Sequence, residues 1–415
     1  MNKPVAIVLG GTVPHKFLIE NLKDRGYQTL LIDYYDNPPA ASVADRHIQE
    51  SILDQDAVLQ IAKQENASLV ISGCVDQANV TACYVAEKLG LPAPYSYETA
   101  LRVTDKALMK AGMVNAGVPT AAYEVVTKGD IESYCSDRFP KVVKPCDCNG
   151  SKGVRKVKCH EELKHALIDA CELSRTEKAI VENFNSGIEV NGYFYIGKED
   201  LTLIYVKRKS LPESFGSKSL QSFLSIGPEE LHPSAKKEFC NAVRKISKEF
   251  GLKNTPILVQ ANIDGADVKI IEFAPRVGGG LAFREIKILT GFNLIASVVS
   301  SYLGENVESN KLITPEGMIS IVHLYGEKGR LSHVEGMTGL IADGVVEEFH
   351  MHKTPGMEMS CSDFSSRNRV LGAIIKFEND NDLELNIKTM IERLSILNSD
   401  GVDVFFKPSL ASRLS

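Results

Sequence analysis

Apolar positions in the first hundred residues form short runs that alternate with amphipathic stretches. The runs Val5–Leu9, Thr29–Ile32 and Leu69–Ser72 have the length of buried strands. Helical spacing of apolar residues predicts helices over Phe17–Asp24, Asp56–Gln64 and Val80–Leu89. This alternation predicts a parallel sheet with helices on both faces. Ligands of such sheets bind beyond the carboxyl ends of the strands, which here carry Gly10-Gly11-Thr12 and Ser72–Asp76.

Two further units follow with a different pattern. The second begins near Asp105 and contains the glycine-bearing segment Pro140–Val157 and a strand that ends at Phe184. Its strands Ile257–Ile263 and Val268–Phe273 are joined by Asp264-Gly265, a favourable hairpin turn. The third unit begins near Lys311 and carries an amphipathic helix, Asp382–Leu394. The Ser-, Gly- and Pro-rich stretch Ser210–Ser225 predicts a long loop.

Composition and charge narrow the class of protein. The 415 residues are too many for one core of usual size, and 44% apolar with 24% charged residues is ordinary for a soluble globular protein. A net charge of -6 with mixed signs argues against nucleic-acid binding. No apolar run approaches the roughly 18–20 residues of a membrane helix, and the apolar start is too short for a signal peptide. Nine cysteines without a secretion signal predict free thiols in the cytoplasm.

A lysine precedes a small glycine loop in the second unit. Lys144 ends an apolar strand, and the loop Gly150-Ser151-Lys152-Gly153 follows. Glycine lets backbone N–H groups approach an anion, and the lysine adds a point charge. The segment matches neither a Walker A loop nor GxGxxG, and by itself an ordinary turn between two strands explains it equally well.

Two glutamates and a hairpin supply the other candidate ligands. Glu182 and Glu189 flank a short linker, and a carboxylate there could accept both ribose hydroxyls, although two solvated glutamates would give the same pattern. Gln260 and Glu272 lie on the two arms of the hairpin, close enough to share an Mg²⁺ that keeps waters and phosphates. Arg276 and the following glycines would meet a carboxylate or an acyl phosphate, unless they form a structural salt bridge and turn.

Taken in order, these elements resemble the ATP-grasp superfamily over nearly the whole chain. The resemblance implies a fold that mixes α/β and α+β units. It places a parallel αβα pre-ATP-grasp domain at 1–103, an ATP-grasp domain of two α+β lobes at 104–308 with its lid at about 120–187, and a small α+β domain at 309–415. The last unit, with His352–Gly356 and Arg369–Ile375, resembles the tail of bacterial L-amino-acid ligases.

The resemblance also implies roles for individual residues. Lys106 and Lys144 match the two lysines that contact ATP phosphates, and Gly150, Ser151 and Gly153 match the loop that closes over them. Glu182 with Asn183, Phe184 and Asn185 matches the adenine-reading linker, and Glu189 matches the ribose ligand. Gln260 and Glu272 match metal ligands, the glutamine being similar to that of carbamoyl phosphate synthetase. Arg276 matches the arginine that meets the carboxylate, with the backbone of Gly279 and Gly280 beside it. Many members carry asparagine where this chain has Ala274, so one Mg²⁺ would be held more loosely or would use an extra water.

These roles imply an ATP- and Mg²⁺-dependent carboxylate–amine ligase that works through an acyl phosphate, with Mn²⁺ as a substitute metal. Small-molecule acids and amines would be its partners, an amino acid among them, and the chain could form a homodimer. Asp76 is the candidate that would orient or deprotonate the amine, with helix capping as the competing explanation. Alternatives are an ATP-grasp carboxylase or purine-pathway ligase and a non-catalytic nucleotide-binding regulator. An oxidoreductase would need the GxGxxG that is missing after Leu9.

Several polar residues stay unassigned on sequence grounds. One of Lys207, Arg208 and Lys209 is expected near the γ-phosphate, but strand alternation does not say which face each takes. His350 and His352 lack a third metal ligand nearby, so we expect them on an exposed strand. Cys146 and Cys148 fall within the phosphate loop, where their spacing is best explained as incidental.

Overall fold

The computed structural model describes residues 3–148, 150, 152–210, 223–309, 311–360 and 368–407. Its first unit is a parallel sheet in the order β3-β2-β1-β4. Almost every side chain of β1, β2 and β4 is buried, as expected of strands covered on both faces. The predicted parallel αβα unit is confirmed. Its elements are β1 (Val5–Leu9), α1 (Val13–Asp24), β2 (Gln28–Asp33), β3 (Arg46–Gln49), α2 (Gln55–Gln64), β4 (Leu69–Ile71), α3 (Asp76–Leu89) and α4 (Tyr97–Thr104).

The second unit is a small antiparallel sheet, here named the lid, with strand order β5-β8-β6-β7. The apolar side of α6 packs on this sheet and forms a core of its own. A helix, α5, joins the lid to the first unit. The elements are α5 (Lys106–Asn115), β5 (Tyr123–Thr127), β6 (Lys141–Pro145), β7 (Arg155–Val157), α6 (His160–Leu173) and β8 (Lys178–Asn183).

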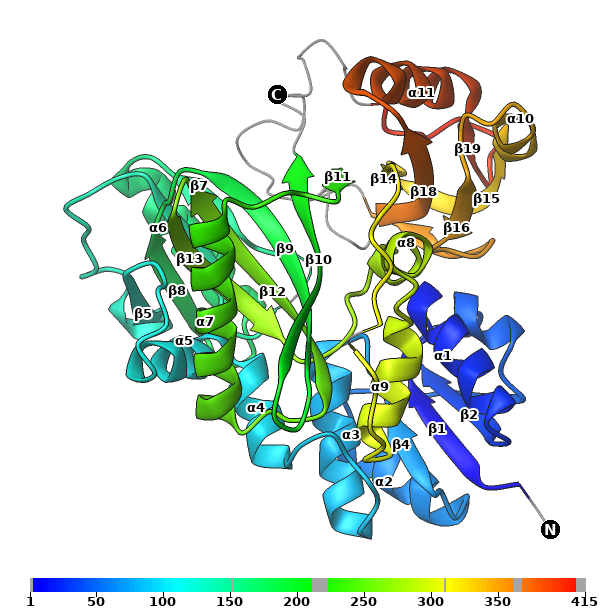
Figure 1. Ribbon diagram of the computed structural model, residues 1–415, viewed down its shortest axis with the longest axis horizontal. Coiled ribbons are helices and arrows are strands. Elements are labelled where there is room, and N and C mark those ends of the chain that lie inside the picture. The colour runs from blue at the N-terminus through cyan, green and yellow to red at the C-terminus, as the bar shows by residue number, and fades with distance from the viewer. Residues whose placement is uncertain are drawn as a thin grey trace.

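An eight-stranded sheet in the order β13-β12-β9-β10-β11-β14-β18-β16 forms the centre of the molecule (Figure 1). Strands from beyond residue 309 pair directly with β11, so the tail continues this sheet. Helices α8 and α9 pack their apolar sides into the core of the first unit. The elements are β9 (Ile188–Ile196), β10 (Leu201–Ser210), β11 (Leu224–Gly227), α7 (Pro233–Phe250), β12 (Thr255–Asp264), β13 (Asp267–Ala274), α8 (Ala282–Thr290), α9 (Leu294–Tyr302), β14 (Met318–Tyr325), β16 (Glu348–Met351) and β18 (Arg369–Phe377).

The remaining tail elements pack beside the far end of the central sheet around a second core. A three-stranded sheet in the order β17-β15-β19 lies there with two helices. These elements are β15 (Gly329–Glu335), α10 (Met337–Ala342), β17 (Glu358–Met359), α11 (Asp380–Arg393) and β19 (Ser395–Asn398).

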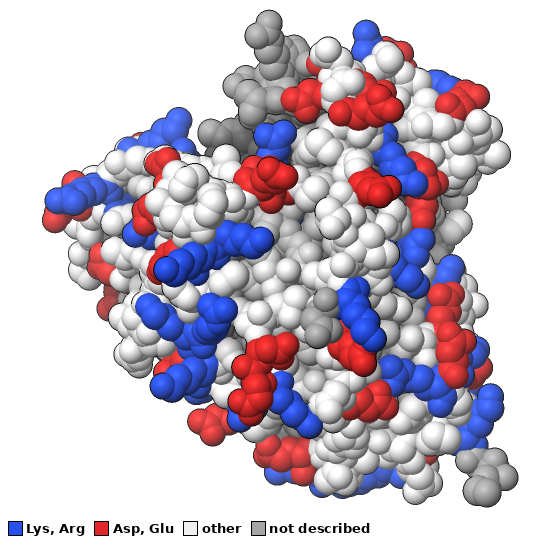
Figure 2. All heavy atoms as spheres, in the orientation of Figure 1, with Lys and Arg blue, Asp and Glu red and all other residues white. Residues whose placement is uncertain are grey.

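Two surface properties bear on the class of protein. Lysine and arginine are interspersed with aspartate and glutamate over the face shown in Figure 2, without a large area of one sign. Among the described residues, no helix is both long and apolar enough to cross a lipid bilayer.

Candidate active site

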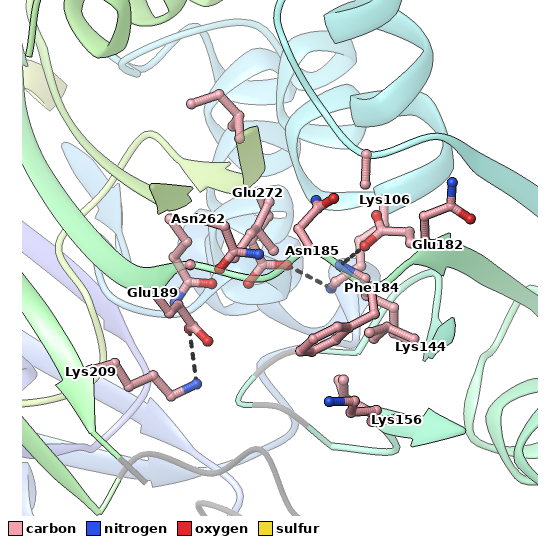
Figure 3. A pocket seen from close by; sticks show the side chains of 18 of the residues that line it. Lys106, Lys144, Lys156, Glu182, Phe184, Asn185, Glu189, Lys209, Asn262 and Glu272 are labelled. Carbon is pink, nitrogen blue, oxygen red and sulfur yellow. Dashed lines mark hydrogen bonds and ion pairs between the residues drawn. The ribbon is translucent and has the colours of Figure 1, made fainter. Parts of the chain in front are cut away.

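A cavity of 530 Å³ lies between the lid and the central sheet (Figure 3). It brings together the three residues on which the ATP interpretation most depends, namely Lys144, Glu189 and Glu272. Six cationic and three acidic side chains line it, which leaves an excess of three positive charges. These are Lys106, Lys110, Lys144, Lys156, Arg208 and Lys209 against Glu182, Glu189 and Glu272. The cavity is therefore suited electrostatically to a polyanion.

At the lid side of the cavity, one buried carboxylate is shared by two lysines. Glu182 on β8 lies 2.7 Å from Nζ of Lys144 and 2.8 Å from Nζ of Lys110. Burial raises the pKa of Glu182, but the charges of the two lysines outweigh it and the net pKa is lowered. Burial lowers the pKa of Lys110 to about 8, whereas Glu182 more than offsets burial at Lys144 and raises its pKa. Glu182 thus fixes the position of the lysines.

Lys106 connects the predicted phosphate loop to the hairpin that carries the predicted metal ligands. Asp105 caps α5 by accepting hydrogen bonds from the N–H groups of Ala107 and Leu108, which starts the helix at Lys106. The ammonium of Lys106 donates to the carbonyl oxygen of Cys148 at 2.5 Å and lies 3.7 Å from Oε2 of Glu272. The ammonium of Lys106 thus lies between the loop carbonyl and the carboxylate of Glu272.

Part of the predicted phosphate loop lines the cavity. Gly150 lines it, while Ser151 lies outside the described residues. Gly153 has φ +73°, and a Cβ there would lie 2.7 Å from Cδ1 of Leu173. Glycine tolerates both the backbone conformation and the close packing, so this position of the loop requires glycine.

The linker between the lid and the central sheet borders the cavity. Asn183, Phe184 and Asn185 all line it, and the Lys156 ammonium lies 3.4 Å from the Phe184 ring centroid. Gly187 has φ +110°, and a Cβ there would lie 2.6 Å from the carbonyl oxygen of Ile263. The absent side chain lets the linker pass against β12 and enter β9.

Glu189 follows at the start of β9, on the opposite side of the cavity from Lys144 (Figure 3). Its carboxylate accepts a hydrogen bond from Nζ of Lys209 at 3.0 Å. Lys209 and Arg208 line the cavity, whereas Lys207 is buried and pairs with Glu285 at 2.8 Å. Of the three candidates for contact with the γ-phosphate, Arg208 and Lys209 therefore lie at the cavity, and Lys207 does not.

The hairpin holds the predicted metal ligands in register. Gln260 on β12 lies directly opposite Glu272 on β13. Asn262, two residues along β12 and hence on the same face, also lines the cavity. One carboxylate and two amide oxygens suit Mg²⁺, which takes its other ligands from water and phosphate. The described residues contain no cluster of three His, Cys, Asp or Glu side chains that would bind a metal alone.

Arg276 lies outside this cavity lining, at the boundary with the first unit. Its guanidinium donates two hydrogen bonds of 2.5 Å to Asp76, the first residue of α3. Burial raises the pKa of Asp76, but Arg276 more than compensates and the net pKa is lowered. Such a carboxylate is a weak base, so Asp76 is better described as the residue that positions Arg276 than as the predicted proton acceptor.

The glycines after Arg276 leave donors free. Among the described residues, the N–H groups of Gly279 and Gly280 donate to no backbone carbonyl, in contrast to that of Val277, which donates to Gly73. They precede α8, whose N-terminus favours negative charge. This arrangement suits an oxyanion next to the arginine.

We expect Asp76→Asn to destabilise the chain by about 2 kcal/mol at neutral pH, because Arg276 loses its charge-assisted hydrogen bonds. The lowered pKa of Asp76 means that its contribution is present above pH 3.8 and is lost as the pH falls through the folded-state value. Denaturant unfolding of both chains over a pH series would measure the difference, which should shrink in acid. A difference that stays constant through acid pH would contradict the assignment.

The sequence interpretation missed Lys110, Lys156 and Asn262. Lys110 is four residues after Lys106, and helical spacing could have suggested a shared face. Asn262 follows Gln260 by two residues on the predicted strand, where alternation gives the same signal. No local spacing in the sequence indicates that Lys156 contacts Phe184.

The expectation of an exposed strand at His350 and His352 is wrong, because both side chains are partly buried against other elements. The ring of His352 lies 6.0 Å from that of His323 on β14.

Comparison with known proteins agrees with this geometry. Residues 137–285 match the family model described as an ATP-grasp domain. A formate-dependent phosphoribosylglycinamide formyltransferase from Syntrophotalea carbinolica is 28% identical over 166 residues, covering 38% of this chain and 42% of the relative. The matched part is thus less than half of that protein.

Solved structures extend the similarity to the whole fold. An L-amino acid ligase from Bacillus licheniformis superposes with a TM-score of 0.77 at 17% identity, covering 96% of this chain and 99% of that one. The biotin carboxylase domain of the Hydrogenobacter thermophilus 2-oxoglutarate carboxylase, solved with MgADP, gives a TM-score of 0.74 at 15% identity, with 95% and 91% covered. The chain carries an ATP-grasp domain within a fold that it shares from end to end with an L-amino acid ligase.

Proposed function

We propose that this chain is an ATP-dependent ligase that joins a carboxylate to an amine through an acyl phosphate and releases ADP and phosphate. The observation that carries the proposal is the cavity with its three excess positive charges and the facing pair Gln260 and Glu272. The metal-bound nucleotide named for the biotin carboxylase domain supports Mg-ATP as the ligand.

The nucleotide would bind along the cavity between the linker and the lysines. The adenine would contact the linker backbone at Asn183–Asn185 and the Phe184 ring, and the ribose would donate to Glu189. Lys106, Lys144 and Lys209 would neutralise the phosphates. Gln260, Asn262 and Glu272 would hold Mg²⁺, which, when bound, stabilises charge on the transferring phosphoryl group. Mn²⁺ would be accepted by the same oxygens.

The acid would bind next to Arg276 and the glycine loop. Activation is needed because attack on a free carboxylate would have to expel oxide. Lys106 lies between the predicted phosphate loop and the hairpin, where it can hold the transferred phosphoryl group against the acid. When the amine attacks the carbonyl carbon of the acyl phosphate, the N–H groups of Gly279 and Gly280 can donate to the developing oxyanion. The carbonyl then re-forms and phosphate leaves.

The attacking amine needs no strong base on the protein. An α-amino group titrates near 7.7–8.0, so about a tenth is neutral at pH 7. Asp76, whose pKa is lowered, would act on the substrate only indirectly, by holding the guanidinium of Arg276 in position.

A purine-pathway ligation or a carboxylation is the second candidate, favoured by the sequence match to the formyltransferase. It would use the same ATP site with a different acid or acceptor. A homodimer remains a prediction for either candidate, and light scattering would test it.

A screen for ADP release tests the proposal directly. Acids and amines, including bicarbonate, formate, amino acids and phosphoribosyl amines, are offered singly and in pairs with Mg-ATP. We expect ADP and phosphate only when an acid and an amine are both present. Formation of AMP and pyrophosphate, or the absence of Mg-ATP binding, would contradict it.

Glu189→Ala should raise the KM for ATP about 10- to 100-fold, because a charge-assisted hydrogen bond of roughly 1.5–3 kcal/mol is lost. Steady-state ADP release at varied ATP would measure it. Glu199→Ala, in the exposed β9–β10 turn, is the matched control and should leave the KM unchanged. An unchanged KM in Glu189→Ala would show that the ribose lies elsewhere.

A further inference from the structure

Three successive carbonyl oxygens of the predicted phosphate loop are held from outside the lid sheet. The N–H of Lys106 donates to the carbonyl oxygen of Cys146 at 2.8 Å, and the ammonium of Lys106 donates to that of Cys148 at 2.5 Å. Between them, Nε2 of Gln77 donates to the carbonyl oxygen of Asp147 at 2.8 Å. Gln77 belongs to the first unit, so this hydrogen bond joins that unit to the loop, and the reaction above makes no use of it.

Gln77 directly follows the carboxylate that holds the arginine. It is the second residue of α3, after Asp76, which accepts the two hydrogen bonds from Arg276. Successive side chains of a helix point about 100° apart, so one residue can face the glycine loop while the next faces the lid. The first turn of α3 therefore contacts both the arginine that we assign to the acid and the loop that we assign to the phosphates.

A third side chain fixes this turn of α3 in place. Asn79 is only 4% exposed, its Oδ1 accepts a hydrogen bond from the N–H of Gly73 at 3.2 Å, and its Nδ2 donates to the hydroxyl of Tyr95 at 2.5 Å. The hydroxyl of Tyr95 in turn donates to the carbonyl oxygen of Pro275 at 3.5 Å, one residue before Arg276. The start of α3 and the arginine are therefore held together by buried hydrogen bonds, and a turn fixed in this way can position what it contacts.

The same loop residue is anchored on the lid side through its carboxylate. Asp147 accepts hydrogen bonds from the backbone N–H of Arg175 at 3.1 and 3.2 Å and from Nε of Arg175 at 3.1 Å. The residues that follow lie at the nucleotide cavity, since Cys148 and Gly150 both line it. Gln77 is partly buried, and loss of its donor would remove the hold of the first unit on the middle of the loop.

We propose that Gln77 is a positioning residue that docks the predicted phosphate loop on α3, so that one helical turn sets the γ-phosphate against the acid held at Arg276. This role rests on the proposed ligase function, whereas the docking contact itself does not. A displacement of about 1 Å between reacting groups can cost about a hundredfold in rate. A docked loop also keeps water from the acyl phosphate until the amine attacks.

Amide hydrogen exchange of the full chain tests the docking without turnover. The N–H groups of Lys106 and Arg175 donate to the loop and report on its position. Both should exchange about tenfold faster in Gln77→Met, which keeps the length of the side chain but removes the donor. Amides of β8, which report on folding of the lid, should exchange as in the unsubstituted chain.

Two further variants sharpen the exchange experiment. Gln77→Glu keeps the shape of the side chain and places a second acceptor against the carbonyl of Asp147, so its acceleration should be at least as large. Gln60→Met, exposed on α2, is the matched control and should leave both reporter amides unchanged. Exchange at Lys106 and Arg175 that is the same in Gln77→Met as in the unsubstituted chain would overturn the proposal.

Kinetics then test the positioning role. Gln77→Met should lower kcat for amide formation at least about tenfold, while the KM for the acid stays within about twofold because Asp76 and Arg276 are unchanged. With the acid but no amine, the variant should release ADP and phosphate, since water attacks the carbonyl carbon of the acyl phosphate and returns the free acid and phosphate. The unsubstituted chain and Gln60→Met should release ADP only when the amine is present.

These readouts separate the docking contact, the positioning role and the ligase function. Faster exchange in Gln77→Met with an unchanged kcat and no ADP release from the acid alone would show that the contact is merely structural and would overturn the proposal. A raised KM for the acid in Gln77→Met would place the defect at Arg276 and would overturn it as well. Faster exchange in that variant, with no ADP release by the unsubstituted chain from any pair, would refute the ligase function and the positioning role and leave the docking contact standing.

Discussion

Glu272→Gln should lower kcat/KM for ADP release about a thousandfold, because the metal site loses its one carboxylate. A loss of about 4 kcal/mol of transition-state stabilisation corresponds to that factor, and bound metals contribute several kcal/mol in phosphoryl transfer. Lys106 also loses the partner that lies 3.7 Å from its ammonium. The substitution keeps the shape of the side chain, so folding should be preserved.

The control for this prediction is on the same hairpin. Asp267→Asn removes an exposed carboxylate that pairs with Lys269 at 3.2 Å, and activity should remain near that of the unsubstituted chain. Excess Mg²⁺ or Mn²⁺ should partly restore the activity of Glu272→Gln, since its defect is in metal affinity. Full activity of Glu272→Gln at low Mg²⁺ would show that Glu272 is not a metal ligand.

The second large effect is on stability. Glu182→Gln leaves Lys110 and Lys144 buried beside each other without their shared counter-ion, and breaking a buried pair in this way costs about 3–5 kcal/mol. Urea unfolding followed by a probe in the lid would measure the loss. The variant should recover stability as the pH rises, because uncompensated buried lysines hold fewer protons in the folded state than in the unfolded state.

A surface pair in the same lid provides the comparison. Glu177 pairs with Lys128 at 3.3 Å, but both side chains are more than half exposed. Glu177→Gln should therefore change stability by less than about 1 kcal/mol. Equal losses in the two variants, or a Glu182→Gln loss that grows with pH, would contradict the assignment of Glu182 as the counter-ion of the lysines.

Local patterns predicted β1, β2 and β4 because these strands are buried apolar runs, whereas the polar, partly exposed strand β3 (Arg46–Gln49) gave no such signal. The strand predicted at Val5–Leu9 has those bounds in the structure. The helix predicted at Phe17–Asp24 begins earlier, at Val13, since Pro14 is tolerated in a first helical turn. The hairpin itself was predictable from its turn, which sets the register as far as Ala261 opposite Ile270, but Gln260 faces Glu272 only because the ladder skips Ile271.

Contacts between distant segments were not predictable. Arg276 and Asp76 are 200 residues apart, and nothing near either one indicates that they pair. From the sequence, Glu182 was interpreted as a solvated or an adenine-contacting residue. Its pairing with two lysines was not predictable, because they come from two other elements, α5 and β6. Arg369 lies on the face of His323 only because the ladder skips Val370. Strand alternation alone would place Arg369 on the other face.

Oxygen transfer from the acid to the released phosphate tests the central claim most directly. An acid and amine that together release ADP are incubated with Mg-ATP after the acid carboxyl has been labelled with ¹⁸O. Attack of the carboxylate on the γ-phosphorus predicts one ¹⁸O atom in each phosphate released. Unlabelled phosphate, with amide formed all the same, would contradict an acyl phosphate and with it the mechanism proposed for this cavity.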